Sequence, residues 1–206
     1  MKRCAVFASG GGSNFQALID RREAGDLHVE LALLVGNNSK AGAFERARTH
    51  GIASVHLPPT RFDDPAEYAD RLMSTLEEHR IDMIALAGYM KKLPDVTIET
   101  FRNRILNVHP ALLPAFGGQG MYGRYVHEAV LESGVKVTGV TVHFVDEHYD
   151  HGPIILQEPV RVLDNDTPAS LAQRVLEAEH AFYWRAVEAV GCDALRVDGN
   201  RVYGRV

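Results

Sequence analysis

Three polar residues in the second half of the chain have the types and spacing that acyl-group chemistry requires. Asn107 and His109 stand one residue apart at the end of an apolar run, and Asp150 follows further along the chain. An asparagine amide can donate to a carbonyl oxygen, a histidine can move a proton near neutral pH, and an aspartate can orient that histidine. No serine or cysteine nucleophile is placed beside a base, so these residues predict direct transfer of an acyl group to an amine.

The loop that carries Asp150 is densely polar: residues 146–153 read Asp-Glu-His-Tyr-Asp-His-Gly-Pro. Such a loop could hold a metal ion, but two of its acids are adjacent and it has no helical His-x-x-x-His pair, so we expect no metal there. We expect instead a loop that covers substrate and turns Asp150 toward His109. The plain alternative for Asn107 and His109 is a strand end whose histidine is hydrogen-bonded within the fold, and the residues alone leave it open.

A second candidate site lies near the N-terminus, where three glycines precede Ser13 and Asn14. Glycines let backbone N–H groups turn toward an anion, and a helix that begins there adds a favourable dipole. Phe15 takes the place of the third glycine of a dinucleotide loop, and the Gly-Lys-Ser/Thr of a nucleoside-triphosphate loop is absent. We therefore expect Gly12, Ser13 and Asn14 to hold one phosphate group; a simple strand–helix turn capped by Ser13 is the alternative.

Composition limits the class of protein and its partners. The chain has 206 residues, of which 46% are hydrophobic and 24% charged, and a net charge of -5. These values are ordinary for a globular domain, and the charge argues against general nucleic-acid or anionic-membrane binding. Cys4 and Cys192 lie near opposite ends and predict neither a disulfide framework nor a cysteine metal site. Because no signal sequence or bilayer-spanning segment is recognisable, we expect a cytoplasmic protein that acts on small molecules.

The order of apolar runs and amphipathic stretches predicts an α/β fold. Strands and helices alternate through the first half, as in a Rossmann-like, three-layer fold with a mostly parallel central sheet flanked by helices. We expect strands at 4–8, 31–35, 54–57, 81–87, 105–108, 136–145 and 154–163, helices at 14–22, 41–50, 65–80, 127–133 and 167–190, and a terminal hairpin over 194–203. The strand at 154–163 is expected at an edge, antiparallel to its neighbour. No repeat or linker interrupts the chain, so we expect a single domain over 1–206.

Five segments, in order along the chain, resemble those of the phosphoribosylglycinamide formyltransferases, folate-dependent enzymes of purine synthesis. They are Ser9–Asn14, Leu86–Met90, Asn107–Pro114, His143–Val145 and Asp150–Pro153. The resemblance implies transfer of the formyl group of 10-formyltetrahydrofolate to the amine of glycinamide ribonucleotide, giving formylglycinamide ribonucleotide and tetrahydrofolate. The folate would be a co-substrate, and no cofactor would stay tightly bound. The N-terminal half would bind phosphate, and the C-terminal half would bind folate and carry out catalysis.

The resemblance also implies a role for each site residue. Asn107 would hydrogen-bond the formyl oxygen, His109 would act in general acid–base and electrostatic catalysis, and Asp150 would raise the pKa of that histidine. The acceptor substrate would be held by Gly12, Ser13, Asn14 and Glu179. The folate would contact Met90, Lys91, Lys92, Leu93, Asn107 and Val145. Taken without the resemblance, Glu179 is an ordinary helix carboxylate, and Met90 and Leu93 read as core.

Two substitutions depart from the family pattern. Pro65 stands where a helix often supplies an arginine, which leaves Arg61 or Arg71 as substitutes. Lys91 replaces an arginine that is frequent at this position. Both differences concern contacts with the folate and leave the chemistry unchanged.

A third departure is residues 116–125, Phe-Gly-Gly-Gln-Gly-Met-Tyr-Gly-Arg-Tyr, here called the glycine-rich segment. It is longer than in many relatives, and the histidine often found there has no clear counterpart, although His127 matches a second one. Ordering so many glycines costs much backbone entropy. The segment is expected either to be a mobile cover that excludes water from the substrates or to be a rigid surface loop.

Three other functions share part of this pattern. A formyltetrahydrofolate hydrolase would use the same polar residues with water as acceptor, but such enzymes usually carry an N-terminal regulatory domain, whereas here the first strand follows Met1 at once. Methionyl-tRNA formyltransferases add a C-terminal RNA-binding domain, whereas this acidic chain ends at Val206. A nucleotide-binding module would use the N-terminal glycines alone. We expect small-molecule substrates, no nucleic acid and no membrane, and a monomer or homodimer.

Overall fold

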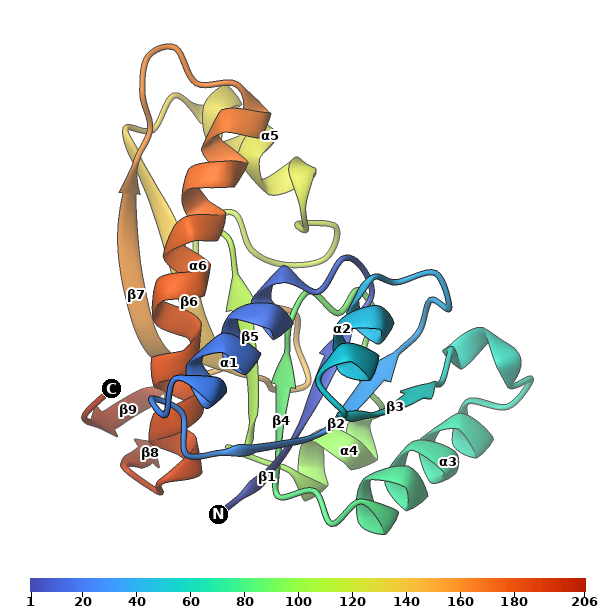
Figure 1. Cartoon of the computed structure of the whole chain (residues 1–206). Helices are drawn as coiled ribbons and strands as arrows, with labels where there is room; N and C mark the ends of the chain where they lie inside the picture. The colour runs from blue at the N-terminus through green and yellow to red at the C-terminus, as the bar shows by residue number, and fades with distance from the viewer.

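The computed structural model describes all 206 residues and contains a seven-stranded sheet with helices on both faces (Figure 1). The strands are β1 (Arg3–Ala8), β2 (Glu30–Gly36), β3 (Ala53–His56), β4 (Met83–Leu86), β5 (Ile105–His109), β6 (Val137–Phe144) and β7 (Ile154–Arg161). Their order in the sheet is β3-β2-β1-β4-β5-β6-β7. The first five strands pair in parallel, whereas β6 is antiparallel to both β5 and β7. The predicted mostly parallel sheet and the antiparallel edge strand are confirmed.

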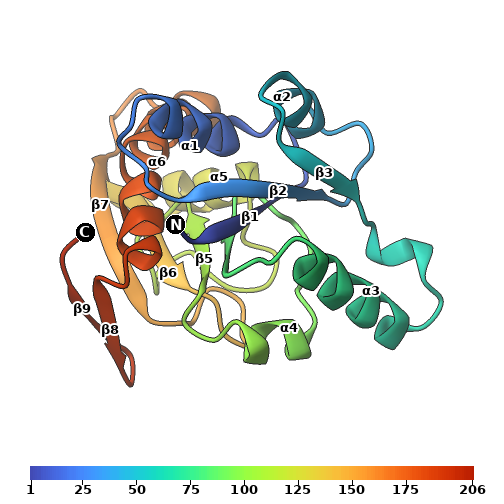
Figure 2. The same ribbon diagram turned by 60° about the horizontal axis from the view of Figure 1, so that its bottom comes forward.

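The helices lie in two layers around this sheet. They are α1 (Ser13–Glu23), α2 (Ala43–Thr49), α3 (Pro65–Glu78), α4 (Asp95–Thr100), α5 (Arg124–Ser133) and α6 (Pro168–Gly191), with a 3-10 turn η1 (Pro59–Arg61) and a terminal hairpin of β8 (Leu195–Asp198) and β9 (Arg201–Gly204). Figure 2 shows α1, α2 and α6 on one side of the sheet and α3 and α4 on the other. The predicted three-layer arrangement is therefore present.

Each face of the sheet has its own hydrophobic core, as the spacing of apolar residues on the helices requires. On one face Phe15 of α1 and Tyr183 of α6 are fully buried against the strands. On the other face Leu72 and Leu76 of α3 pack with Ile98 of α4. Residues three and four apart lie on one side of a helix, so each helix turns a single apolar stripe inward. Burial of each such leucine stabilises the fold by roughly 2 kcal/mol.

The structure differs from the sequence expectations mainly in short elements. Helix α4 and the turn η1 were not predicted, because their few residues show no helical period. β4 is shorter than the predicted 81–87. Asp82, the one polar residue of that apolar run, lies just before the strand, and its carboxylate accepts from the Arg3 N–H at 2.8 Å. The long helix begins after Thr167, where Thr167 and Ser170 form a capping box and Pro168 takes the first turn.

The parallel strands place several chain segments at one edge of the sheet. β1, β4 and β5 are neighbours and point the same way, so the loops that follow them meet at their carboxyl ends. The antiparallel β6 ends opposite the start of β5, where Phe144 pairs with Leu106, and the loop between β6 and β7 folds back from there to bring Asp150 beside Asn107 and His109. The helices of this chain include none with the length and apolar character needed to cross a membrane.

Candidate active site

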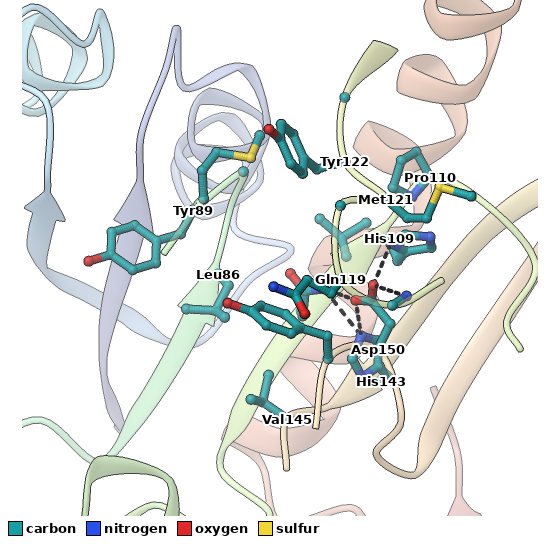
Figure 3. A pocket seen from close by; sticks show the side chains of 18 of the residues that line it. Leu86, Tyr89, His109, Pro110, Gln119, Met121, Tyr122, His143, Val145 and Asp150 are labelled. Atoms are coloured by element: carbon teal, nitrogen blue, oxygen red, sulfur yellow. Dashed lines mark hydrogen bonds and ion pairs between the residues drawn. The ribbon is translucent and has the colours of Figure 1, made fainter. Parts of the chain in front are cut away.

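A cavity of about 940 Å³ opens at the carboxyl ends of β4 and β5, between the loops that follow these strands and the first half of α6. The predicted site residues that line it are Asn14, Met90, Lys91, Lys92, Leu93, Asn107, His109, Val145, Asp150 and Glu179. Gly12 does not line this cavity, and Ser13 lines a separate one of about 530 Å³. Figure 3 shows Leu86 and Tyr89 on one side of the cavity and His109 and Met121 on the other. One cavity thus gathers most of the residues chosen from the sequence.

Asn107, His109 and Asp150 come together in this cavity. β5 holds the first two on the same side of the sheet, because alternate residues of a strand point the same way. Asp150 comes from the β6–β7 loop, where it adopts a positive φ of 54°. Its Oδ1 lies 3.5 Å from Asn107 Nδ2, and its Oδ2 lies 3.6 Å from His109 Nδ1. The predicted loop that turns Asp150 toward His109 is therefore present (Figure 3).

The ring of His109 is fixed by a backbone carbonyl of the glycine-rich segment. Its Nε2 lies 2.8 Å from the Phe116 carbonyl oxygen, and because a carbonyl can only accept, Nε2 carries the hydrogen. Burial lowers the pKa of His109 below its usual value, although the Asp150 charge and the Phe116 carbonyl both raise it. Asp150 thus acts in the direction expected, but burial outweighs it. A neutral His109 presents its Nδ1 lone pair toward Asp150 and can accept a proton there.

Asp150 is held in its ionised form although it is mostly buried. The Gly118 N–H donates to its Oδ2 at 3.0 Å. Burial raises the pKa of Asp150, but its contacts with His143, His109 and this N–H outweigh burial and lower the pKa. The segment comes this close because residue 117 is glycine, whose Cβ, if present, would lie 3.2 Å from the Asp150 Cβ. A carboxylate is therefore kept beside the imidazole ready to stabilise a positive charge on it.

His143 is a site residue whose role the sequence did not reveal. The antiparallel register of β5 and β6 places it directly opposite Asn107. Its Nδ1 donates to the Phe144 carbonyl at 2.8 Å, which in the uncharged tautomer leaves Nε2 to accept from Asn107 Nδ2 at 3.1 Å; the same Nε2 lies 3.7 Å from Asp150 Oδ1. This contact fixes which way round the Asn107 amide lies. The alternation around His143 was visible in the sequence, but its pairing with Asn107 depends on a register that the sequence does not show.

Two further polar side chains, His127 and Gln119, line the cavity. His127, which matches a family histidine, is buried, and its Nδ1 has no hydrogen-bond partner. Burial lowers the pKa of His127, and the nearby His109 lowers it further. Gln119 lies in the stretch where the other family histidine has no counterpart, and its side chain reaches the cavity (Figure 3).

The far end of the cavity joins two residues from opposite ends of the chain. Asn14, at the start of α1, donates through Nδ2 to Glu179 Oε2 of α6 at 2.6 Å. Burial raises the pKa of Glu179 to about 7, although the Asn14 amide lowers it. A carboxylate that changes charge near neutral pH can accept from hydroxyl or amide groups of a ligand when ionised. The sequence resemblance selected both residues, and the fold brings them into contact.

Replacing Glu179 with glutamine is expected to stabilise the unliganded protein at pH 8. The folded carboxyl has a pKa of about 7, above the unfolded value, so ionisation costs the folded state stability as pH rises from about 4.5 to 7. Glutamine keeps the contact with Asn14 and removes this cost, a gain of up to about 3 kcal/mol. Urea unfolding at pH 4.5 and pH 8 measures it: the variant should gain stability over wild type only at the higher pH. An equal difference at both pH values would contradict the assignment.

The N-terminal glycines pack against α2 and precede Asn14, which lines the cavity. Gly12 is the first residue of the α1 turn at a φ of 72°, and no side chain caps the helix, so the alternative of a Ser13 cap is not observed. A Cβ at Gly12 would lie 2.8 Å from the Ala43 Cβ. The Gly11 carbonyl accepts from Arg46 Nε at 2.8 Å. The first N–H groups of α1 thus have no side-chain acceptor, as an anion site requires.

The loop after β4 supplies the wall predicted to contact folate. Leu93 is buried, whereas Met90 is half exposed, and the Met90 N–H donates to Ser9 Oγ at 2.8 Å. Lys92 turns outward and pairs with Asp95 at 3.2 Å. The wall is completed by Val145 from the β6–β7 loop (Figure 3). Leu93 and Val145 thus form an apolar slot, and the Lys92 charge lies at its rim.

Neither proposed substitute for the family arginine reaches the cavity. Pro65 is the first residue of α3 and follows the N-cap residue Asp64. Proline suits this position because it has no N–H to donate in the first turn of a helix. Arg61 and Arg71 are both absent from the lining of the cavity. Of the basic residues predicted for the folate side, Lys91 and Lys92 do line it.

Comparison with known proteins agrees with this geometry. Residues 2–187 match the family model described as formyl transferase. A curated relative from Vigna unguiculata, named phosphoribosylglycinamide formyltransferase, chloroplastic, is 46% identical over 92% of this chain and 61% of its own length. The phosphoribosylglycinamide formyltransferase of Bacillus subtilis (strain 168) is 39% identical over 89% of this chain and 91% of its own.

A solved structure shares the whole fold. Glycinamide ribonucleotide transformylase 1 from Symbiobacterium toebii superposes with a TM-score of 0.93 at 37% identity, covering 100% of this chain and 95% of that one. The chain spans about three fifths of the length of the plant relative and nearly all of the bacterial ones. With a matching family model over most of its residues and relatives of this identity, the chain belongs to the formyl transferase family.

Proposed function

We propose that this chain transfers the formyl group of 10-formyltetrahydrofolate to the amine of glycinamide ribonucleotide, a step of purine synthesis. The observation that carries the proposal is the meeting of Asn107, His109 and Asp150 in one cavity that also holds the Asn14–Glu179 pair. The names of the relatives support the choice of substrates. The ribonucleotide would lie toward Glu179, and the folate would lie in the apolar slot beside Leu93.

The proposal includes the setting in which the enzyme works. We propose that residues 1–206 act as one domain on small molecules only, in the cytoplasm, as a monomer or homodimer, with 10-formyltetrahydrofolate as a co-substrate and no cofactor kept bound. The net charge of -5 supports the exclusion of nucleic acid as a partner.

The geometry supports a direct transfer. The neutral amine attacks the formyl carbon, a C–N bond forms, and the carbonyl oxygen becomes an oxyanion. One Asn107 amide hydrogen points to His143, and the other, only weakly held at 3.5 Å from Asp150, can donate to this oxyanion. His109 takes the proton that the new ammonium loses and delivers it to the folate nitrogen as the old C–N bond breaks. Asp150 and the Phe116 carbonyl stabilise the imidazolium formed in between.

A formyl-transfer assay tests the proposal. Purified protein is mixed with 10-formyltetrahydrofolate, and the folate absorbance is followed with and without glycinamide ribonucleotide. We expect rapid turnover that requires the ribonucleotide, with formylglycinamide ribonucleotide as product. Equal turnover without the acceptor would make the enzyme a hydrolase, and no turnover in either case would reject formyl chemistry.

Replacing His143 with alanine is expected to lower kcat about 10-fold with little change in either KM. The alanine removes the acceptor that holds the Asn107 amide in place, so the amide loses orientation that matters most in the transition state. Steady-state kinetics with each substrate varied measures the effect. The matched variant His143→Gln keeps a carbonyl acceptor and should recover part of the loss; if it is as slow as alanine, or if KM carries the change, the positioning role is wrong.

Protease cleavage within the glycine-rich segment is expected to be fast in the free enzyme and slow with both ligands bound. A Cβ at Gly118, Gly120 or Gly123 would meet nothing within 4 Å, and Tyr122 is half exposed, so few contacts hold the outer part of the segment. Substrates beneath it would add such contacts and order it. Limited proteolysis with mass spectrometry, in the presence of neither, one or both ligands, measures the rates. Ligand-independent cleavage would favour the alternative of a rigid surface loop.

A further inference from the structure

The β6–β7 loop contains a second group of polar side chains, Asp146, His148 and His151, to which the proposed mechanism gives no catalytic step, although Asp146 and His148 also line the cavity. Asp146, His148 and His151 each offer one possible ligand atom, and these atoms all lie within 4.8 Å of one another. The two histidines are exposed, while the Asp146 side chain is only 17% exposed. The group surrounds Asp150 in sequence, but its ligand atoms are distinct from the contacts that Asp150 makes with His109 and Gly118.

We propose that Asp146, His148 and His151 bind one divalent transition-metal ion. Two imidazoles and one carboxylate suit Zn²⁺, Co²⁺ or Ni²⁺, whereas Mg²⁺ and Ca²⁺ prefer oxygen ligands alone. Zinc sits about 2.0–2.2 Å from nitrogen and oxygen ligands, so tetrahedral ligands stand about 3.3 Å apart. The side chains need to close by about 1.5 Å at most, which rotation of the two exposed imidazoles provides. Three protein ligands leave the remaining positions to water.

The carboxylate of this group is already in place. Asp146 Oδ2 lies 2.7 Å from His151 Nδ1, and Asp146 Oδ1 accepts from the His148 N–H at 2.9 Å. The turn therefore places the Asp146 carboxylate between the backbone of His148 and the ring of His151. The centroids of the two imidazole rings are 5.5 Å apart. A metal bound at His151 Nδ1 would take the place of the hydrogen in its contact with Asp146, with the ring carrying its hydrogen on Nε2 instead. The His148 N–H would continue to hold the carboxylate through its other oxygen.

The charges around the group favour a cation. Residues 145–153 contain no lysine or arginine, and the acidic residues among them are Asp146, Glu147 and Asp150. Glu147 is paired with Arg102, which neutralises it. Asp146 brings its own negative charge as a ligand, and Asp150 adds a second carboxylate to the same loop. The spacing of these residues along the chain argued against a metal because it matches no helical motif, but a tight turn brings ligands together at spacings that a helix cannot use.

Metal binding would join the two ends of the turn that carries Asp150. Asp146 precedes this residue and His151 follows it, so an ion held by both restrains the backbone between them. The binding itself does not depend on the proposed formyl transfer. A metal titration tests the site, and the formyl-transfer assay in the presence of a chelator tests the function, so either can fail alone.

Calorimetric titration of the purified protein with Zn²⁺, and with Co²⁺ followed by its visible absorption, tests the proposal. We expect saturable binding of one ion per chain, and an increase in melting temperature with metal. The variant His148→Ala/His151→Ala should bind at least 10-fold more weakly. The matched control is His28→Ala, which removes an exposed imidazole paired with Glu188 at 2.9 Å outside the loop and should bind as wild type does.

Melting curves without metal establish whether the double variant folds as wild type does. If it does not, Asp146→Asn replaces it, because this variant keeps both imidazoles and weakens only the anionic ligand; it too should bind at least 10-fold more weakly. The proposal is overturned if wild type shows no saturable binding, if the loop variants bind as tightly as wild type, or if His28→Ala weakens binding to the same extent.

Discussion

Replacing His109 with alanine is expected to lower kcat for formyl transfer by about 100-fold or more, with acceptor binding near the wild-type level. The ring is buried, with Nε2 held by the Phe116 carbonyl and Nδ1 facing Asp150. It therefore contributes little to substrate binding and much to the proton transfer that completes the reaction. Steady-state kinetics and an independent measurement of ribonucleotide affinity give the two quantities. A His109→Ala enzyme with full activity would remove this residue from the mechanism.

The three polar residues are expected to behave as a unit. Asn107→Ala and Asp150→Ala should each reduce kcat about 100-fold, and a double variant should lose far less than the product of the two single losses. The reason is that Asp150 acts through its contacts with Asn107 and His109, which lie 3.5 and 3.6 Å away. Strictly multiplicative losses would show that the residues act independently.

Replacing Gly12 with valine is expected to destabilise the fold by about 2–5 kcal/mol. A β-branched residue at a φ of 72° is strained, at a cost of about 1–2 kcal/mol, and overpacking against α2 costs about 1–3 kcal/mol more. The Cβ would lie 2.9 Å from the Ala43 Cα, so backbone and not a flexible side chain must move. Urea unfolding measures the loss. Wild-type stability would mean that the α1–α2 contact adapts without cost.

Gly11 offers the matched control, because a Cβ there meets nothing within 4 Å. Gly11→Val should leave the free energy of unfolding within about 1 kcal/mol of wild type. It should nevertheless lower the affinity for the ribonucleotide, because the valine side chain would stand where the phosphate approaches the loop. Folate affinity should not change. If Gly11→Val binds the ribonucleotide normally, the phosphate lies elsewhere.

The sequence predicted the large elements because each carries a strong periodic signal. The helix over 167–190 and the buried strands near 4–8 and 105–108 appear within a few residues of their expected bounds. The short α4 was missed because six residues give too little pattern. The strand at 154–163 was expected at an edge and antiparallel to its neighbour, and β7 is both.

The candidate site was predictable in its residues and less so in its contacts. Asn107 and His109 could be placed together because a strand fixes their common side. The partners that set their chemistry could not be found this way: His143 reaches Asn107 through strand register, and the carbonyl of Phe116 reaches His109 through a loop whose path no motif describes. Backbone groups carry no signature in a sequence, because every residue has them.

The backbone contacts of the glycine-rich segment also bear on how the formyl donor is protected from water. The Phe116 carbonyl raises the pKa of His109, and the Gly118 N–H lowers that of Asp150. With the segment held away from the cavity, His109 would lose the Phe116 carbonyl that holds its Nε2, and Asp150 would lose the Gly118 N–H. Burial, the main cause of the low pKa of His109, would be lost in the same movement. Opening would thus release the orientation of both groups as it admits water, and closure would restore it. In the proposed reaction, one stretch of main chain would both exclude water and align the acid–base residues, so a formyl donor bound without its acceptor would be spared from hydrolysis.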